Sequence, residues 1–213
     1  MENLLVDEFI LFYIAHYDKA FGRDAAEIAL PPIKKIKHLL SEIYFKTDVS
    51  WKGDKNSKIL EYGCSNGFNL RYLERAGFKN LYGVDAIYDY IDLTKEFKDS
   101  NIKYDCHNFS DTIMEMEWDK TPSVSYEEKG FDFIFTKSVL QEGSAGYGKV
   151  SVTNSDGDVK NILLKFKDIL KDSGILILYE GQETRDWNKL SNEVGFDLFT
   201  MKERDIHLLR KKL

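Results

Sequence analysis

The sequence predicts an α/β protein with a doubly wound, mostly parallel sheet and N-terminal helices. A short apolar run, Ile59 and Leu60, leads through Glu61 into a turn of small residues. Helical spacing follows this turn, and a second apolar run begins at 81. Helical periodicity returns at 162–170 and 187–194. The length of 213 residues fits one domain with its own core.

The first strand, the helix after it and the second strand organise the rest of the chain. Gly63, Ser65 and Gly67 are small residues at alternating positions, which suits a chain that leaves a parallel strand and turns directly into a helix. Gly77 is placed to end this helix. Asp85 closes the second strand, and a ligand is expected at the carboxyl ends of such strands.

Periodicity also predicts the flanking elements. Asp172–Gly174 is expected to end the helix at 162–170, and 111–129 is expected to be a short helix and then a surface loop. The loop at 141–160 is rich in glycine, which fits either a closing loop or an ordinary flexible connection. The other predicted helices lie at 4–21, 33–44, 88–97 and 187–194, and a closing antiparallel pair at 197–201 and 207–210.

The turn after the first strand narrows the class of ligand. It lacks the Walker pattern, and from Gly63 the chain fails the dinucleotide pattern G-x-G-x-x-G. The segment Glu61-Tyr62-Gly63-Cys64-Ser65-Asn66-Gly67 resembles the first motif of class I S-adenosylmethionine-dependent methyltransferases, acidic-x-Gly-x-Gly-x-Gly. Ser65 replaces the middle glycine and is able to cap the helix. This resemblance implies that the cofactor lies beside Glu61, Gly63, Cys64, Ser65 and Gly67.

The resemblance continues through the later strands. It implies that Asp85 binds both ribose hydroxyls, since a carboxylate offers two acceptor oxygens. Ala86 and Ile87 would then lie beside the adenine. Segments 101–109, 131–135 and 174–180 look like the third, fourth and fifth strands. The resemblance therefore adds three more cofactor-binding candidates at strand ends, namely Asn108, Phe109 and Thr136.

The same family implies the sheet order 3-2-1-4-5-7-6, with the last strand antiparallel. The chain is expected to be a single methyltransferase domain, 1–213, with a helical lid at 1–50 and a cofactor-binding core at 57–213. Tyr13, Tyr17 and Phe21 are the candidate lid residues. The alternative is that this aromatic stripe packs on the sheet.

Composition limits the partners. Acids outnumber bases by 36 to 30, a net charge of −6, which disfavours nucleic acid. Cys64 and Cys106 are the two cysteines, and with four scattered histidines no zinc spacing appears, so no metal is expected. Neither a signal peptide nor a membrane span is recognised, so a cytoplasmic protein is expected.

Methyl transfer from a sulfonium requires mainly that acceptor and methyl group be aligned. A base is needed only for a protonated acceptor, and the candidates are Glu142, His107 and Tyr147. Many small-molecule members of the family have Leu-x-His after the fourth strand. Here Leu140-Gln141-Glu142 puts Glu142 in the place of the histidine.

Four functions remain open at this stage. A methyltransferase for a small-molecule acceptor is favoured, because the chain is compact and acidic. A methyltransferase for protein or RNA is the first alternative. The chain has Thr136-Lys137-Ser138-Val139 where amino-methylating nucleic-acid enzymes carry [DNS]-P-P-[YF], which disfavours that branch. A non-catalytic partner protein that binds S-adenosylmethionine and a nicotinamide dehydrogenase complete the set, since fold alone does not choose among them. The sequence discloses no oligomeric state.

Overall fold

The computed structural model describes residues 54–64, 67–75, 77–86, 88–95, 100–109, 125–137, 139–140, 155–180, 185–201 and 206–212. All of them except Asp54 belong to one unit, Lys55–Leu213. Several predictions lie outside these residues: the helices at 4–21 and 33–44, the lid residues Tyr13, Tyr17 and Phe21, the short helix of 111–129 and residues 141–154 of the predicted loop at 141–160. The predicted end of that loop is wrong, because residues 156–160 form the start of a helix that Ser155 caps.

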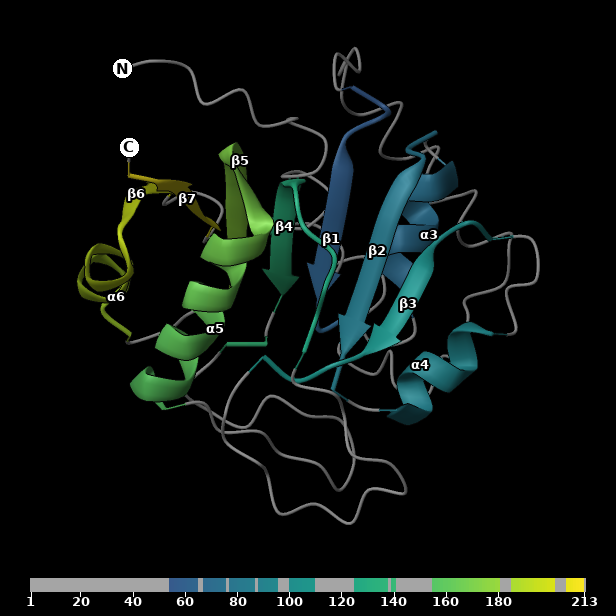
Figure 1. Ribbon diagram of the computed structural model, residues 1–213, viewed down its shortest axis with the longest axis horizontal. Coiled ribbons are helices and arrows are strands. Elements are labelled where there is room, and N and C mark those ends of the chain that lie inside the picture. The colour runs from purple at the N-terminus through teal and green to yellow at the C-terminus, as the bar shows by residue number, and fades with distance from the viewer. Residues whose placement is uncertain are drawn as a thin grey trace. The chain divides into compact units, whose positions relative to one another are not determined.

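The described residues form a seven-stranded sheet in the order β3-β2-β1-β4-β5-β7-β6 (Figure 1). Neighbouring strands from β3 to β5 are parallel, and β7 is antiparallel to both β5 and β6. The predicted strand order and the antiparallel last strand are therefore confirmed. The strands are β1 (Lys58–Tyr62), β2 (Asn80–Asp85), β3 (Lys103–Cys106), β4 (Phe131–Lys137), β5 (Leu170–Tyr179), β6 (Phe196–Met201) and β7 (Ile206–Lys211).

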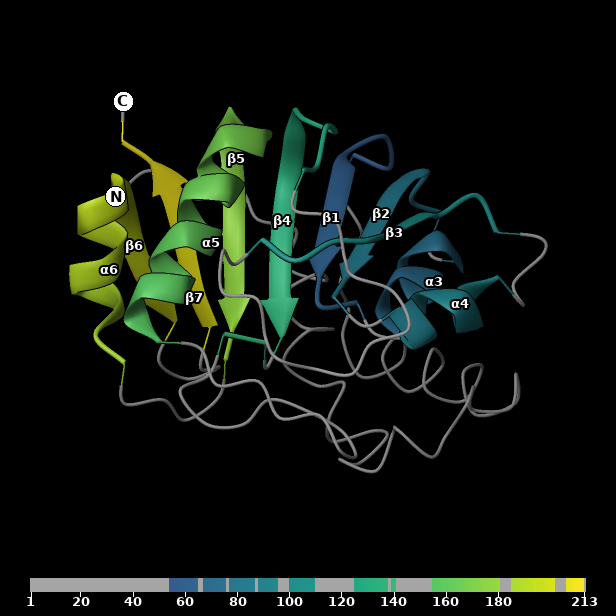
Figure 2. The same cartoon turned by 60° about the horizontal axis from the view of Figure 1, so that its bottom comes forward.

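The described helices pack in two groups, one on the β2 and β3 side of the sheet and the other on the β5 and β6 side. α3 contacts β2, and α4 contacts β2 and β3, whereas α5 and α6 pack on each other and contact β5 and β6 (Figure 2). These helices are α3 (Phe68–Arg75), α4 (Tyr88–Thr94), α5 (Asp156–Ile169) and α6 (Trp187–Val194).

The chain reverses its direction across the sheet between β1 and β4. β1 leads through α3 to β2, and β4 leads through α5 to β5, so the two crossovers run outward from adjacent strands. Right-handed crossovers then place α3 and α5 on opposite faces. Ligands of doubly wound sheets bind at this switch point, beyond the carboxyl ends of the strands.

Local sequence explains where the helices on the β5 side begin and end. Ser155 caps α5 in a capping box, in which its side chain accepts from the Asp158 amide and the Asp158 side chain accepts from the Ser155 amide. Asp186 caps α6, and Gly195 ends it, so the predicted helix at 187–194 is confirmed. The buried residues of α5 recur at helical spacing: Val159, Ile162, Leu163, Phe166 and Ile169.

β5 begins earlier than predicted. The sequence assigned Asp172–Gly174 to the end of the preceding helix, but α5 ends at Ile169 and β5 starts at Leu170. Leu170 pairs with Phe131 before a register shift, and regular pairing with β4 resumes at Ile175. The strand boundary is thus set by a partner on β4, which local periodicity does not report.

Aromatic side chains fill one face of the core. The Tyr62 ring stacks on Phe109, with centroids 4.8 Å apart, and lies edge-on to Phe166 at 5.3 Å. Tyr126 stacks on Phe131 at 6.4 Å and is tilted against Phe109 at 5.4 Å. All but Tyr126 are buried, so the segment at 125–130 adds its aromatic ring to the main core.

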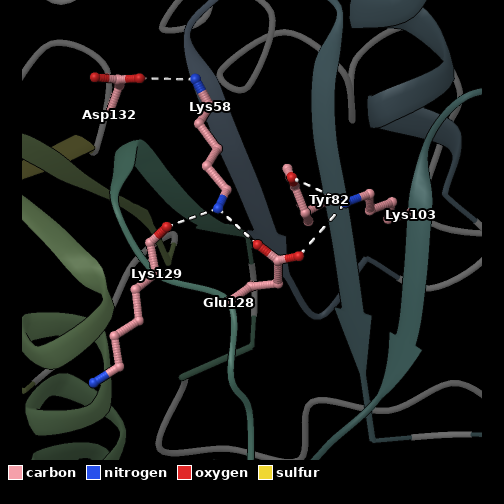
Figure 3. Close-up of polar contacts among 6 residues, drawn as sticks. All are labelled: Lys58, Tyr82, Lys103, Glu128, Lys129 and Asp132. Atoms are coloured by element: carbon pink, nitrogen blue, oxygen red, sulfur yellow. Dashed lines mark hydrogen bonds and ion pairs between the residues drawn. The ribbon is translucent and has the colours of Figure 1, made fainter.

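A polar network holds this segment at the amino ends of the strands (Figure 3). Lys58 Nζ donates to Glu128 Oε2 and to the Lys129 carbonyl, each at 2.7 Å, while Lys103 Nζ lies 3.5 Å from Glu128 Oε1. The Lys58 ammonium also lies over the Tyr82 and Phe131 rings, 4.9 and 4.8 Å from their centroids. This network therefore lies at the amino ends of the strands, whereas the ligand is expected at their carboxyl ends.

We expect Glu128→Gln to lower the free energy of unfolding by less than about 1 kcal/mol, because partly exposed ion pairs are screened by water and salt. Urea unfolding at low and high salt measures this, with exposed Glu127→Gln as the matched control. A loss above roughly 2 kcal/mol that persists at high salt would contradict the surface character of the network.

Candidate active site

The glycine turn at the end of β1 bends over β2. The Gly63 and Cys64 amides both donate to the Val84 carbonyl, at 2.7 and 3.0 Å, and the Gly67 amide donates to the Cys64 carbonyl at 2.8 Å. Gly63 and Gly67 have φ angles of 76° and 74°, a region that favours glycine. Substitution would also be blocked by space, because a Cβ at Gly63 would overlap the Val139 side chain.

Tyr104 crosses from β3 to the same turn. Its hydroxyl donates to the Gly67 carbonyl at 3.3 Å, and a Cβ at Gly67 or at Gly83 on β2 would overlap its ring or hydroxyl. Gly83 thus leaves the space through which Tyr104 reaches the start of α3. The sequence analysis did not single out Tyr104, whose role depends on a glycine in the neighbouring strand.

Glu61 is a buried acid beneath the turn. Its Oε1 accepts a hydrogen bond from the side-chain amide of Asn69 on α3, and its Oε2 is buried without a hydrogen-bond partner among the described residues. Burial raises the pKa of Glu61 to about 8, against the opposing effects of Asn69 and Lys137. A buried carboxyl oxygen with unused hydrogen-bonding capacity suits a polar group on a ligand.

Asp85 lies at the end of β2, beside the glycine turn. Its side chain is buried, and its backbone carbonyl accepts from the His107 amide at 3.0 Å. The next carbonyl, of Ala86, lies 3.6 Å from the Cys106 sulfur. The negative charge of Asp85 contributes to the raised pKa values of Glu61 and Cys64, so these groups lie close to one another. The structure therefore brings Glu61, Gly63, Cys64, Gly67, Asp85 and Ala86 together.

Tyr62 ties the end of β3 to the end of β1. Its hydroxyl accepts from the Phe109 amide at 3.2 Å and donates to Asn108 Oδ1 at 3.5 Å. Burial raises the pKa of Tyr62, so it stays a neutral donor. Asn108 is partly buried at this strand end, whereas the Phe109 ring lies in the aromatic core. The His107 ring lies edge-on to Tyr126, with Nε2 4.0 Å from Asp105 Oδ2.

Glu180 organises the loop after β4. Thr136 is fully buried, and its hydroxyl donates to Glu180 Oε1. The Val139 and Leu140 amides both donate to Glu180 Oε2, at 2.8 Å each. The Thr136 hydroxyl is thus engaged inside the protein. The sequence analysis did not select Glu180, although a carboxylate directly after an apolar strand was the signal used for Asp85.

The remaining candidates lie outside the described residues: Ser65, Ile87, Glu142 and Tyr147. Both cysteines are free thiols whose pKa values are raised by burial, so neither is a thiolate near neutral pH. Within the described ranges, no group of histidine, cysteine, aspartate or glutamate residues has the arrangement of a metal site. No described helix combines the length and hydropathy needed to span a membrane.

Known proteins share this architecture. Residues 53–211 match the methyltransferase domain family. A TehB-like SAM-dependent methyltransferase from Corynebacterium glutamicum is 17% identical, with a TM-score of 0.52 over 94% of this chain and 99% of that chain. A SAM-dependent methyltransferase from Mesorhizobium loti is 10% identical, with a TM-score of 0.51 over 74% of this chain and 91% of that chain. YcgJ from Bacillus subtilis is 12% identical, with a TM-score of 0.50 over 78% of this chain and 70% of that chain.

The structural similarities show the fold, and the family match covers most of the chain. A search of curated protein sequences finds no significant match. The residues at the strand ends fit the cofactor of this family, because the glycine turn, the unused oxygen of Glu61 and the carboxylate of Asp85 lie together there. The chain belongs to the class I, Rossmann-like methyltransferases, whose cofactor is S-adenosylmethionine.

Proposed function

We propose that the protein is a cytoplasmic enzyme that transfers a methyl group to a small-molecule acceptor by in-line displacement. The observation that carries the choice of acceptor is the sequence at the end of β4 and just beyond it, Thr136-Lys137-Ser138-Val139. Amino-methylating nucleic-acid enzymes carry [DNS]-P-P-[YF] there, whereas the Thr136 hydroxyl of this chain is bound to Glu180. The net charge of −6 supports the choice, because phosphate-rich acceptors would be repelled.

The proposed roles follow the strand ends. The turn from Gly63 to Gly67, with Ser65, approaches the cofactor closely through its backbone, and Glu61 Oε2 forms a hydrogen bond with a polar group of the cofactor. Asp85 accepts from both ribose hydroxyls. Ala86, Ile87 and Asn108 border the adenine.

Bound S-adenosylmethionine supplies a methyl group that its sulfonium already activates. The protein's own contribution is therefore to hold the acceptor in line with that group and to exclude water. His107, Glu142 and Tyr147 remain the candidate bases for an acceptor that arrives protonated. Of these, His107 is the described one, and its packing against Tyr126 gives it a structural role as well.

Transfer of a labelled methyl group tests the proposed acceptor class. The protein is incubated with methyl-labelled S-adenosylmethionine and with the small-molecule, protein and RNA fractions of an extract from the cells that encode it. We expect label in the small-molecule fraction, and none with Asp85→Ala. Label in protein or RNA would assign the enzyme to a macromolecular acceptor. Cofactor binding without transfer to any fraction would favour a non-catalytic partner protein.

A further inference from the structure

Glu180 connects β5 with the loop after β4, although it lies about 40 residues from that loop in the sequence. It is 1% exposed, and its two carboxylate oxygens accept hydrogen bonds from the end of β4 and from the loop that follows. One oxygen accepts from Thr136, whose Cα pairs with Tyr62 on β1 and with Leu178 on β5. The other oxygen accepts from two consecutive backbone amides, those of Val139 and Leu140. The carboxylate therefore fixes both the start and the end of this short segment.

The same segment contacts the glycine turn at the end of β1. Leu140 is fully buried, and the Val139 side chain fills the space where a Cβ at Gly63 would lie. Any displacement of Val139 thus changes the packing beside Gly63, whose own backbone angle is restricted. Glu180, Val139 and Gly63 form a continuous contact from β5 to the switch point between β1 and β4.

We propose that Glu180 is a positioning residue for cofactor binding, which holds Val139 against Gly63 and so keeps the glycine turn in its binding conformation. Its burial and its bonds to the loop leave Glu180 acting through the loop rather than by touching the cofactor. This inference rests on the proposed cofactor site. It follows that loosening the loop should lower the population of the binding conformation and raise the apparent Kd in proportion.

Two variants, Glu180→Gln and Thr136→Val, weaken the hydrogen bonds of Glu180 to a larger and to a smaller extent. Glu180→Gln keeps the shape of the side chain but removes its charge and turns one acceptor oxygen into a donor. Thr136→Val removes one hydroxyl and leaves in place both hydrogen bonds that the Val139 and Leu140 amides donate to Glu180. Asp132→Asn is the matched control, because Asp132 also accepts from a backbone amide, Lys58 N at 2.8 Å, but at the amino ends of the strands.

Calorimetric titration with S-adenosylhomocysteine gives the Kd, and urea unfolding of the free variants gives their stability. We expect Kd to rise about tenfold in Glu180→Gln and about threefold in Thr136→Val. These rises correspond to a binding conformation that is populated about one tenth and about one third of the time, respectively. Asp132→Asn should lose stability with its Kd unchanged, which separates positioning from a general loss of folding.

Backbone amide exchange provides a local readout. Val139 and Leu140 should exchange faster in Glu180→Gln because their common acceptor is weakened. Faster exchange there with an unchanged Kd would overturn the inference, and so would equal rises in Kd for Glu180→Gln and Asp132→Asn. If Glu180→Gln does not fold, Thr136→Val decides, and an unchanged Kd in that variant overturns the inference. Failure of the wild-type protein to bind the ligand would instead contradict the proposed cofactor site itself.

Discussion

Asp85→Ala is expected to weaken binding of S-adenosylhomocysteine by about 100-fold or more. Each hydrogen bond to a charged group contributes about 1.5 to 3 kcal/mol, and in the proposed site the Asp85 carboxylate accepts from both ribose hydroxyls. Loss of both contacts therefore removes about 3 kcal/mol of binding free energy, which corresponds to about two decades in Kd. Asp85→Asn keeps one acceptor oxygen and should give an intermediate loss.

The free Asp85→Ala protein should be at least as stable as the wild type above about pH 8. The charge of Asp85 contributes to the raised pKa of Glu61, so where Glu61 ionises the removal of Asp85 relieves repulsion between the two carboxylates. Thermal-shift titration with S-adenosylhomocysteine, and with NADH in parallel, separates the two effects. At one hundred times its Kd, a ligand that binds only the folded state adds about 2.7 kcal/mol. Equal shifts in wild type and variant, or a shift with NADH alone, would contradict the role given to Asp85.

Glu61→Gln is expected to stabilise the free protein at alkaline pH by several kcal/mol. The pKa of Glu61 is about 8 in the folded protein, against an ordinary value of 4.5. Both states hold the proton below pH 4.5, where burial has no electrostatic effect. As pH rises toward 8 the unfolded chain ionises first and the folded state loses stability, up to about 5 kcal/mol. Glutamine carries no such proton, and its amide oxygen still accepts from Asn69.

Urea unfolding between pH 5 and pH 9 tests this expectation. The difference between Glu61→Gln and wild type should be small at pH 5, grow through neutral pH and level off above pH 8. Glu128→Gln provides a surface control, because that carboxyl has a pKa lowered by Lys58 and contributes no growing penalty in this range. Parallel stability curves for wild type and Glu61→Gln would show that the Glu61 carboxyl ionises normally in the folded protein.

Features that depend on near neighbours in the sequence were predictable. The turn at Gly63 and Gly67, the helix stop at Gly195 and the carboxylate at the end of β2 all follow from residues within a few positions. The family resemblance then supplied the strand order, which the sheet confirms.

Features that depend on distant contacts were not predictable from one sequence. β5 begins at Leu170 because Phe131 pairs with it. Thr136 was a cofactor-binding candidate, but its hydroxyl bonds to Glu180 across a separation of 44 residues. The path of Tyr104 over Gly83 likewise requires β2 and β3 to be adjacent. Periodicity identifies the strands, and the pairing between them decides which side chains meet.

Hydrogen exchange with and without S-adenosylhomocysteine tests most directly whether the cofactor binds at the carboxyl ends of β1, β2 and β3. We expect slower exchange in peptides that cover 61–75, 82–90 and 104–109. Peptides that cover 125–132 and 170–174, at the amino ends of β4 and β5, should keep their rates. Protection confined to those amino-end peptides, or no protection at ligand concentrations well above the wild-type Kd, would contradict the site.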